Sequence, residues 1–136
     1  MSRVQHGGNV LLLRTACITL IIGLILAWCL TFTKLVKIPF MVDLFQHPEK
    51  LLSAHLDFLM MTMLLFGFYA SKITLPKYVQ WSMAIGSLTN PGLFILAAIV
   101  GNDLSAFIML LVVVSFSLTT FGYGLGAIKL LRYSLK

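Results

Sequence analysis

The run NVLLLRTACITLIIGLILAWCLTF, from Asn9 to Phe32, decides the class of this protein. It contains a single charged residue, Arg14, and it is longer than the roughly 20 helical residues that cross a bilayer core about 30 Å thick. It also exceeds the apolar core of a signal peptide, and no small-x-small cleavage site closes it. We therefore expect this run to stay in the protein as its first membrane span.

Three further apolar runs follow, at about 50–71, 78–100 and 104–131. In the whole chain of 136 residues, 60% of the side chains are hydrophobic and 10% are charged, which leaves too little polar surface to cover a soluble globule. The runs are apolar throughout, whereas strands of an outer-membrane barrel alternate polar and apolar residues. The sequence predicts an all-α membrane protein that consists of one domain, residues 1–136, with a bundle of four transmembrane helices.

The net charge of +6 does not indicate a nucleic-acid-binding protein. The basic residues are scattered at the ends of the apolar runs and form no patch with interleaved aromatic residues. Those on the expected side of the N-terminus are Arg3, Arg14, Lys72, Lys77, Lys129, Arg132 and Lys136, and those on the other side are Lys34, Lys37 and Lys50. The positive-inside rule then predicts that both termini are cytoplasmic.

His55 and Asp57 are the ionisable residues that lie deepest in the second span, between its outer end and the membrane mid-plane. Two residues along a helix correspond to about 200° of rotation, so the two side chains point to nearly opposite faces. Thr62 shares the face of His55, and Ser53 and Met61 share the face of Asp57. If one face looks into the bundle and the other toward a second subunit, a site at a subunit interface follows.

Several roles remain open for these two residues. His55 either donates a hydrogen bond to a neighbouring helix, binds a metal or a haem, or transfers protons. Asp57 either stays protonated, accepts hydrogen bonds from a neighbouring helix, or belongs to a site. The sequence contains no phosphate-binding loop, no HExxH and no zinc-type cysteine and histidine cluster, which argues against a soluble type of hydrolase.

The third and fourth spans carry polar and small residues at membrane depth. Pro91 removes a backbone hydrogen bond, so we expect a kink there, with Asn90 beside it. This region forms either one wall of a cavity or a contact that serves packing alone. Small residues on one stripe of the fourth span predict close helix contact, and they are Ser115, Thr119, Gly122 and Gly126.

Three motifs, in this order, resemble those of the hydroxylaminobenzene mutases and the related styrene oxide isomerases. They are the opening Gln5-His6-Gly7, the stretch QHPEKLLSAHLD from Gln46 to Asp57, and Asn90-x-Gly92. Each motif is short, but their order, the chain length and the expected helices also agree, so the resemblance extends over essentially the whole chain.

The resemblance implies a homotrimer in a bacterial inner membrane, with haem b held between subunits and His55 as the ligand of the iron. It also places Asn90 and Asp57 among the catalytic residues and puts Met61 and Phe94 in the substrate pocket. The family has an asparagine at the position of Met61 and a tyrosine at the position of Phe94, and both groups assist the substrate. We therefore expect a different substrate, slow turnover of styrene oxide, or no catalysis.

These observations lead to one expected function and two alternatives. The expected function is an isomerase in which ferric haem acts as a Lewis acid on a small apolar epoxide or N-hydroxyl compound, without net oxidation or reduction. No second histidine is obviously placed to bind the iron, since His6 starts at the opposite surface and His47 lies beyond Pro48. The alternatives are a b-type haem subunit for electron transfer or sensing, and a membrane accessory protein without haem.

Overall fold

The computed structural model describes residues 8–101 and 105–135, and every regular element within these ranges is a helix. Four of the helices are long, namely α1 (Val10–Lys34), α3 (Pro48–Ala70), α4 (Lys77–Val100) and α5 (Ala106–Ser134). Each of them is long and apolar enough to cross a membrane. The predicted fold of four membrane-spanning helices is confirmed, and the predicted ends differ from the observed ends by only a few residues.

The short helix α2 (Pro39–Leu44) lies in the connection between α1 and α3, where the sequence predicts only an interfacial segment. Pro39 stands at its first position, where the missing N–H costs nothing. None of its residues is buried, and Phe40 is 67% exposed. An apolar segment that packs against little of its own chain is suited to lie at the membrane surface.

Proline and glycine set the ends of α3 and α4. Pro48 begins α3, and Pro76 is the residue before α4. Gly101 ends α4 at φ +81°, in the left-handed region that favours glycine. A Cβ atom on Gly101 would come within 2.9 Å of Nε2 of His47, so this corner accepts only glycine without a shift of the imidazole.

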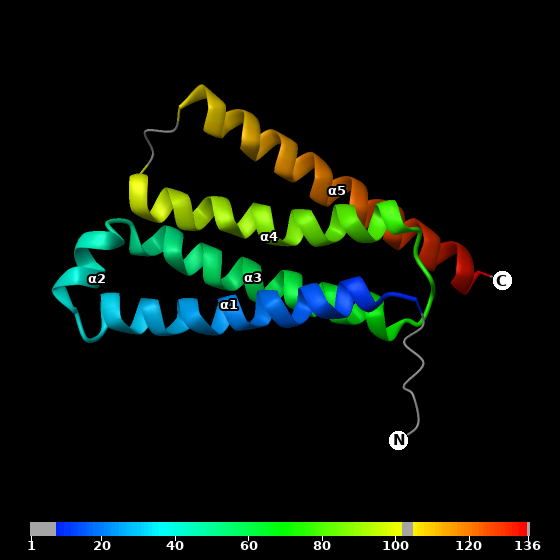
Figure 1. Cartoon of the computed structure of the whole chain (residues 1–136), viewed down its shortest axis with the longest axis horizontal. Coiled ribbons are helices and arrows are strands. Elements are labelled where there is room, and N and C mark those ends of the chain that lie inside the picture. Colours follow the sequence, from blue (N-terminus) through cyan, green and yellow to red (C-terminus); the bar gives the residue numbers. More distant parts are fainter. Residues whose placement is uncertain (1–7, 102–104, 136) are drawn as a thin grey trace, which may run out of the picture.

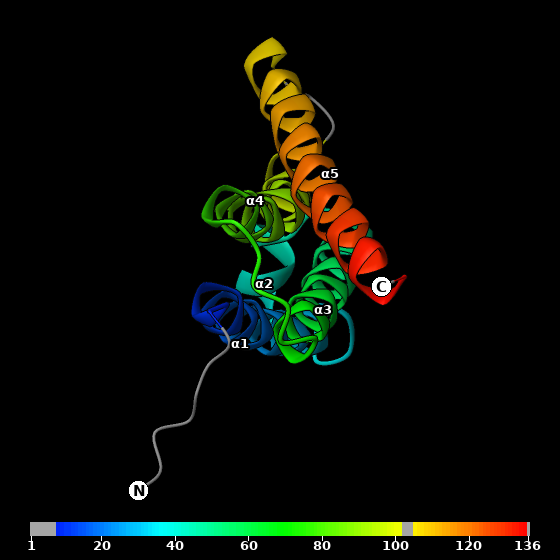
Figure 2. The same cartoon turned by 90° about the vertical axis from the view of Figure 1, so that its right-hand side faces the viewer.

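The helices are arranged as a tight group of three with a fourth at an angle (Figure 1). Helix α3 packs against both α1 and α4, and α5 packs mainly against α4. Both views show that α5 diverges from the other helices toward its beginning and approaches them toward its end (Figures 1 and 2). The start of α1 and the end of α5 therefore lie at the same end of the bundle.

Two apolar clusters fill the interior, one toward each end of the bundle. The cluster near the start of α1 contains Leu12, Ala16, Leu65, Leu75, Val79 and Met83. The cluster near the start of α3 contains Leu26, Phe45, Leu51, Ala54, Phe58 and Ala98. Many other large apolar side chains face outward, as expected of helices whose surroundings are lipid.

Hydrogen bonds join the chain at both ends of the three-helix group. Near the start of α1, the side chain of Asn9 donates to the carbonyl of Ile73 at 2.8 Å and accepts from the N–H of Leu75 at 3.1 Å. At the other end, the N–H of His47 donates to the carbonyl of Ala98 at 3.2 Å. The first contact joins α1 to the α3–α4 connection, and the second joins the start of α3 to the end of α4.

The small residues of α5 allow α4 and α5 to approach closely, as the sequence predicts. A Cβ atom on Gly122 would lie 2.8 Å from the backbone nitrogen of Met83. On the facing helix, a Cβ atom on Gly86 would lie 2.9 Å from Cα of Thr119. This contact sets the angle between α4 and α5, and that angle determines the space between α3, α4 and α5.

Candidate functional site

The side chain of His55 is held by the backbone of α1. Its Nδ1 lies 2.8 Å from the carbonyl oxygen of Gly23, and because a carbonyl only accepts, Nδ1 carries the proton and donates. In this tautomer the lone pair is on Nε2. Within the described residues, the bond to Gly23 is the hydrogen bond that positions this half-buried ring, and it leaves Nε2 as the free ligand atom.

The face of α3 that carries His55 lies against α1. The hydroxyl of Thr62, two turns further along α3, lies 2.8 Å from the hydroxyl of Thr19 on α1. Leu59, one turn after His55, is so close that a Cβ atom on Gly23 would lie 3.2 Å from its Cδ2. The absence of a side chain at Gly23 therefore lets α1 and α3 approach closely beside His55.

Asp57 lies on the opposite face of α3 and contacts α4. The side-chain amide nitrogen of Asn90 donates to Oδ2 of Asp57 at 2.9 Å, and both residues are half-buried. The two opposite faces of α3 predicted from the helix rotation are observed, but both contact helices of the same chain, whereas the sequence interpretation turned one of them toward a second subunit. His55 joins α3 to α1, and Asp57 joins α3 to α4.

Asp57 and Asn90 line a cavity of about 450 Å³ between α3, α4 and α5. Met61 and Phe94 line the same cavity, so the structure brings together four of the five candidate residues from the sequence. The fifth, His55, is outside it. The remaining wall is mostly apolar and is formed by Ser53, Leu56, Met60, Phe116 and Thr119. The sequence does not indicate the contribution of Phe116, because its position depends on the angle of α5.

The other polar residues in the middle of α4 join it to α5. The hydroxyl of Ser87 lies 2.6 Å from that of Tyr123, and the hydroxyl of Thr89 lies 2.7 Å from that of Ser115. Asn90 is thus the member of this group that faces the cavity. Helix α4 continues without interruption through Pro91, which is buried. The proline at which we expect a kink therefore does not end the helix.

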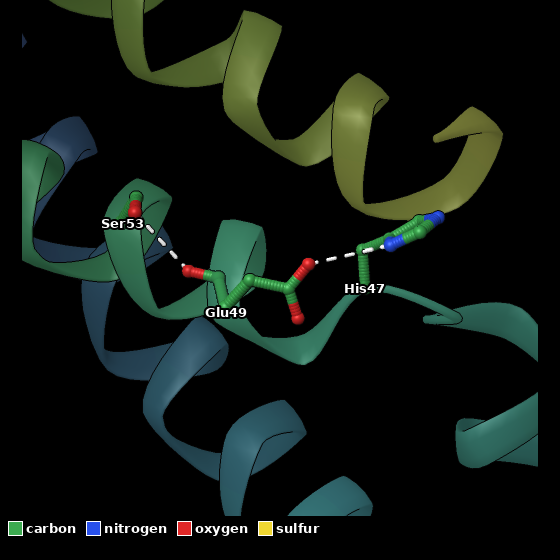
Figure 3. A network of polar contacts seen from close by, with 3 residues as sticks. All are labelled: His47, Glu49 and Ser53. Carbon is green, nitrogen blue, oxygen red and sulfur yellow. Dashed lines mark hydrogen bonds and ion pairs between the residues drawn. The ribbon is translucent and has the colours of Figure 1, made fainter. Parts of the chain in front are cut away.

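A second polar group lies at the start of α3, in the stretch QHPEKLLSAHLD that carries the family resemblance. Figure 3 shows the carboxylate of Glu49 beside His47, with 3.3 Å between Oε1 and Nδ1. The hydroxyl of Ser53 donates to the backbone carbonyl of Glu49 at 3.1 Å (Figure 3). Because the side chains of His47 and Glu49 are 39% and 63% exposed, this pair contributes little to stability.

The residues can be tested against the haem that the resemblance implies. Among residues 8–101 and 105–135, no group of three or more His, Cys, Asp or Glu is placed to hold a bare metal ion. Haem iron needs only one side chain, because the porphyrin supplies four ligands. A histidine whose second ring nitrogen donates to a backbone carbonyl is the usual form of such a ligand. The donor arrangement at His55 fits haem.

The described residues hold no second histidine whose ring nitrogen donates to a backbone carbonyl within a span. His47 contacts Glu49 at the surface of the bundle, far along α3 from the middle of the span. Cys17 and Cys29 are both free thiols on α1. His55 is therefore the one histidine within a described span.

The chain matches no family model, no curated protein and no solved structure. The resemblance to the styrene oxide isomerases and hydroxylaminobenzene mutases therefore rests on the sequence motifs alone, and the function has to be argued from the site.

Proposed function

We propose that this protein is a membrane isomerase that binds haem b through His55. The observation that carries this proposal is the 2.8 Å contact between Nδ1 of His55 and the carbonyl of Gly23, which fixes the tautomer and leaves Nε2 able to bind iron. On α3, the apolar residues Leu52 and Leu59 lie one turn to either side of His55. An apolar setting of this kind favours a large, flat, mostly apolar cofactor.

When bound, haem iron would supply a Lewis acid for an epoxide or N-hydroxyl oxygen, and the reaction would be a rearrangement without net oxidation or reduction. The substrate is a small apolar molecule, because the cavity of about 450 Å³ is lined mainly by Met, Phe and Leu side chains. Its few polar groups are suited to orient one oxygen atom in an otherwise apolar space.

Asn90 and Asp57 provide these polar groups. One N–H of the Asn90 amide is used by Oδ2 of Asp57. This bond orients the amide, so that its second N–H and its carbonyl remain for a substrate oxygen or hydroxyl. Met61 and Phe94 exclude water from the same space but form no such hydrogen bonds, which is the reason to expect slow turnover of styrene oxide.

The proposed assembly is a homotrimer in a bacterial inner membrane, with both termini cytoplasmic. Within one chain, His55 and the cavity lie on opposite faces of α3. The His55 face packs against α1, but the ring is only half-buried, so a complete site requires the cavity of one copy to meet the exposed edge of this ring in another. This division of the site supports an oligomer, and the number of three comes from the family resemblance.

The test is the absorbance spectrum of protein purified in mild detergent from haem-replete cells. We expect a Soret band in the wild type and in His47→Ala, the matched control at the other described histidine, and no Soret band in His55→Ala. Added imidazole restores the band in His55→Ala, because it replaces the missing ligand. A role in packing alone predicts no such rescue.

A colourless, folded wild-type protein would overturn the proposal. His55 would then serve only to join α3 to α1 through Gly23, as in the accessory-protein alternative. A low-spin spectrum with two histidine ligands and reversible reduction by a quinol would instead favour the electron-transfer alternative.

A further inference from the structure

A second cavity lies at the end of the bundle where α4 begins and α5 ends. Its volume is about 470 Å³, and we call it the end pocket. Four of its lining residues carry polar ends, namely Tyr78, Lys129, Arg132 and Tyr133. The others are apolar and come from the α3–α4 connection, the first turn of α4 and the inner face of α5. The end pocket is separate from the cavity that contains Asp57 and Asn90.

The charges around the end pocket all have one sign. Lys129 and Arg132 are three residues apart on α5, so they share one face of the helix. The four acidic residues of the chain are at positions 43, 49, 57 and 103, and none of them belongs to the segments that line the end pocket. Among the residues that the structure describes, the two cations in this wall have no acidic partner, so they attract an anion.

The start of α4 adds a further positive contribution. Its first turn contains no acidic residue, and no side chain forms a capping hydrogen bond there. The first N–H groups of a helix carry a partial positive charge and favour phosphate groups. Tyr78 of this turn lines the end pocket, so the helix end and the two cations act on the same space.

The floor of the end pocket is apolar. Val79 is 2% exposed, and Leu125 is half-buried beside it. Tyr78 and Tyr133 are 61% and 66% exposed, as expected of aromatic residues at the level of lipid headgroups. A ligand for this space needs a negative charge at one end and a hydrocarbon chain at the other.

We propose that the end pocket binds one anionic phospholipid, whose phosphate lies among Lys129, Arg132 and the start of α4, and whose acyl chain covers the apolar floor. The proposal does not depend on haem or on isomerase activity. It predicts a bound lipid that is distinct from the surrounding bilayer, because its site is a cavity with its own charges and not the general basic surface of this membrane end.

The test compares lipid binding to the full chain by native mass spectrometry in detergent. Phosphatidylglycerol is expected to bind with one molecule per chain and to be retained where phosphatidylcholine is lost. The double variant Lys129→Gln/Arg132→Gln is expected to lower the affinity about 25-fold, from roughly 5-fold for each cation near a phosphate. Lys129→Arg/Arg132→Lys keeps both charges and is expected to bind within about 3-fold of the wild type.

The matched control is Arg14→Gln/Lys72→Asn, which removes the same number of charges from the same end of the bundle, outside the end pocket. Both residues are exposed, and asparagine suits position 72 because Lys72 has φ +56°. We expect it to retain phosphatidylglycerol. Equal loss in the two double variants, or equal binding of phosphatidylcholine, would overturn the site.

Inorganic phosphate and glycerol phosphate identify the source of the anion. For a lipid site, neither compound displaces phosphatidylglycerol at millimolar concentration, since both lack the acyl chain that covers the floor. If either compound binds as tightly as the lipid and displaces it, the end pocket is a site for a soluble phosphate compound and the lipid proposal is wrong.

Discussion

Gly122→Ala tests the close approach of α4 and α5, on which the shape of the cavity between α3, α4 and α5 depends. The added methyl group would lie 2.8 Å from the backbone nitrogen of Met83 and 3.0 Å from the carbonyl carbon of Ser82. Backbone atoms of a helix do not move aside as the tip of a side chain does, so α5 has to shift away from α4. Overpacking of this kind costs about 1–3 kcal/mol.

Gly124→Ala is the control, two residues further along the same helix. A Cβ atom at Gly124 would have no neighbour within 4 Å. Alanine is more favourable than glycine inside a helix by roughly 0.5–1 kcal/mol, so this variant is expected to be neutral or slightly more stable. The two substitutions have the same chemistry, and the expected difference of about 2 kcal/mol in the free energy of unfolding comes from the contact with α4.

The measurement is reversible unfolding in mixed micelles, followed by circular dichroism while the fraction of denaturing detergent is raised. Gly122→Ala is expected to unfold at a lower fraction of denaturing detergent than the wild type, and Gly124→Ala at the same or a higher fraction. Equal unfolding free energies for the two variants, within about 0.5 kcal/mol, would refute the close approach of the helices at Gly122.

Three further predictions test other contacts. Asn9→Ala removes both hydrogen bonds to the α3–α4 connection and is expected to lower the free energy of unfolding by about 2 kcal/mol in the same assay. Asn9→Asp loses only the donor. An unchanged free energy of unfolding in Asn9→Ala would show that water replaces both bonds. Thr62→Val removes the bond to Thr19 and is expected to cost only about 0.6 kcal/mol, so a larger loss than in Asn9→Ala would contradict the measured weakness of such bonds within membranes. Met61→Asn combined with Phe94→Tyr places two hydrogen-bonding groups in the cavity and is expected to raise styrene oxide turnover about 10-fold in a product assay; unchanged turnover would argue against that substrate class.

The helices and the two faces of α3 follow directly from the sequence. Long apolar runs have one compatible structure in a bilayer, and the fixed rotation per residue separates His55 from Asp57 without any knowledge of their partners. The sequence does not identify the groups that His55 and Asp57 contact. The carbonyl of Gly23 is part of the backbone and leaves no signal in a side-chain pattern. The helix rotation places Met61 on the face of Asp57, but placing Phe94 beside them required the family resemblance, because residues on different helices share no common period.

The end pocket shows a different limit of the sequence. The basic residues near the end of α5 predict orientation in the membrane, and the same side chains line a cavity with Tyr78. Which of these basic residues meet across a cavity depends on the angle between α4 and α5. That angle is set by backbone contacts at glycine, as at Gly122, and small residues indicate that helices approach but not at what angle.

The hydrogen bonds at the two ends of the bundle bear on the order in which the chain is assembled during synthesis. The partners of Asn9 and of His47 all precede α5 in the chain. The group of α1, α3 and α4 can therefore close as soon as α4 has entered the membrane, while α5 is still being made. Helix α5 then packs on a surface that already exists. Its contact with Gly86 completes the cavity between α3, α4 and α5, so the last of the described helices to be made completes the candidate site.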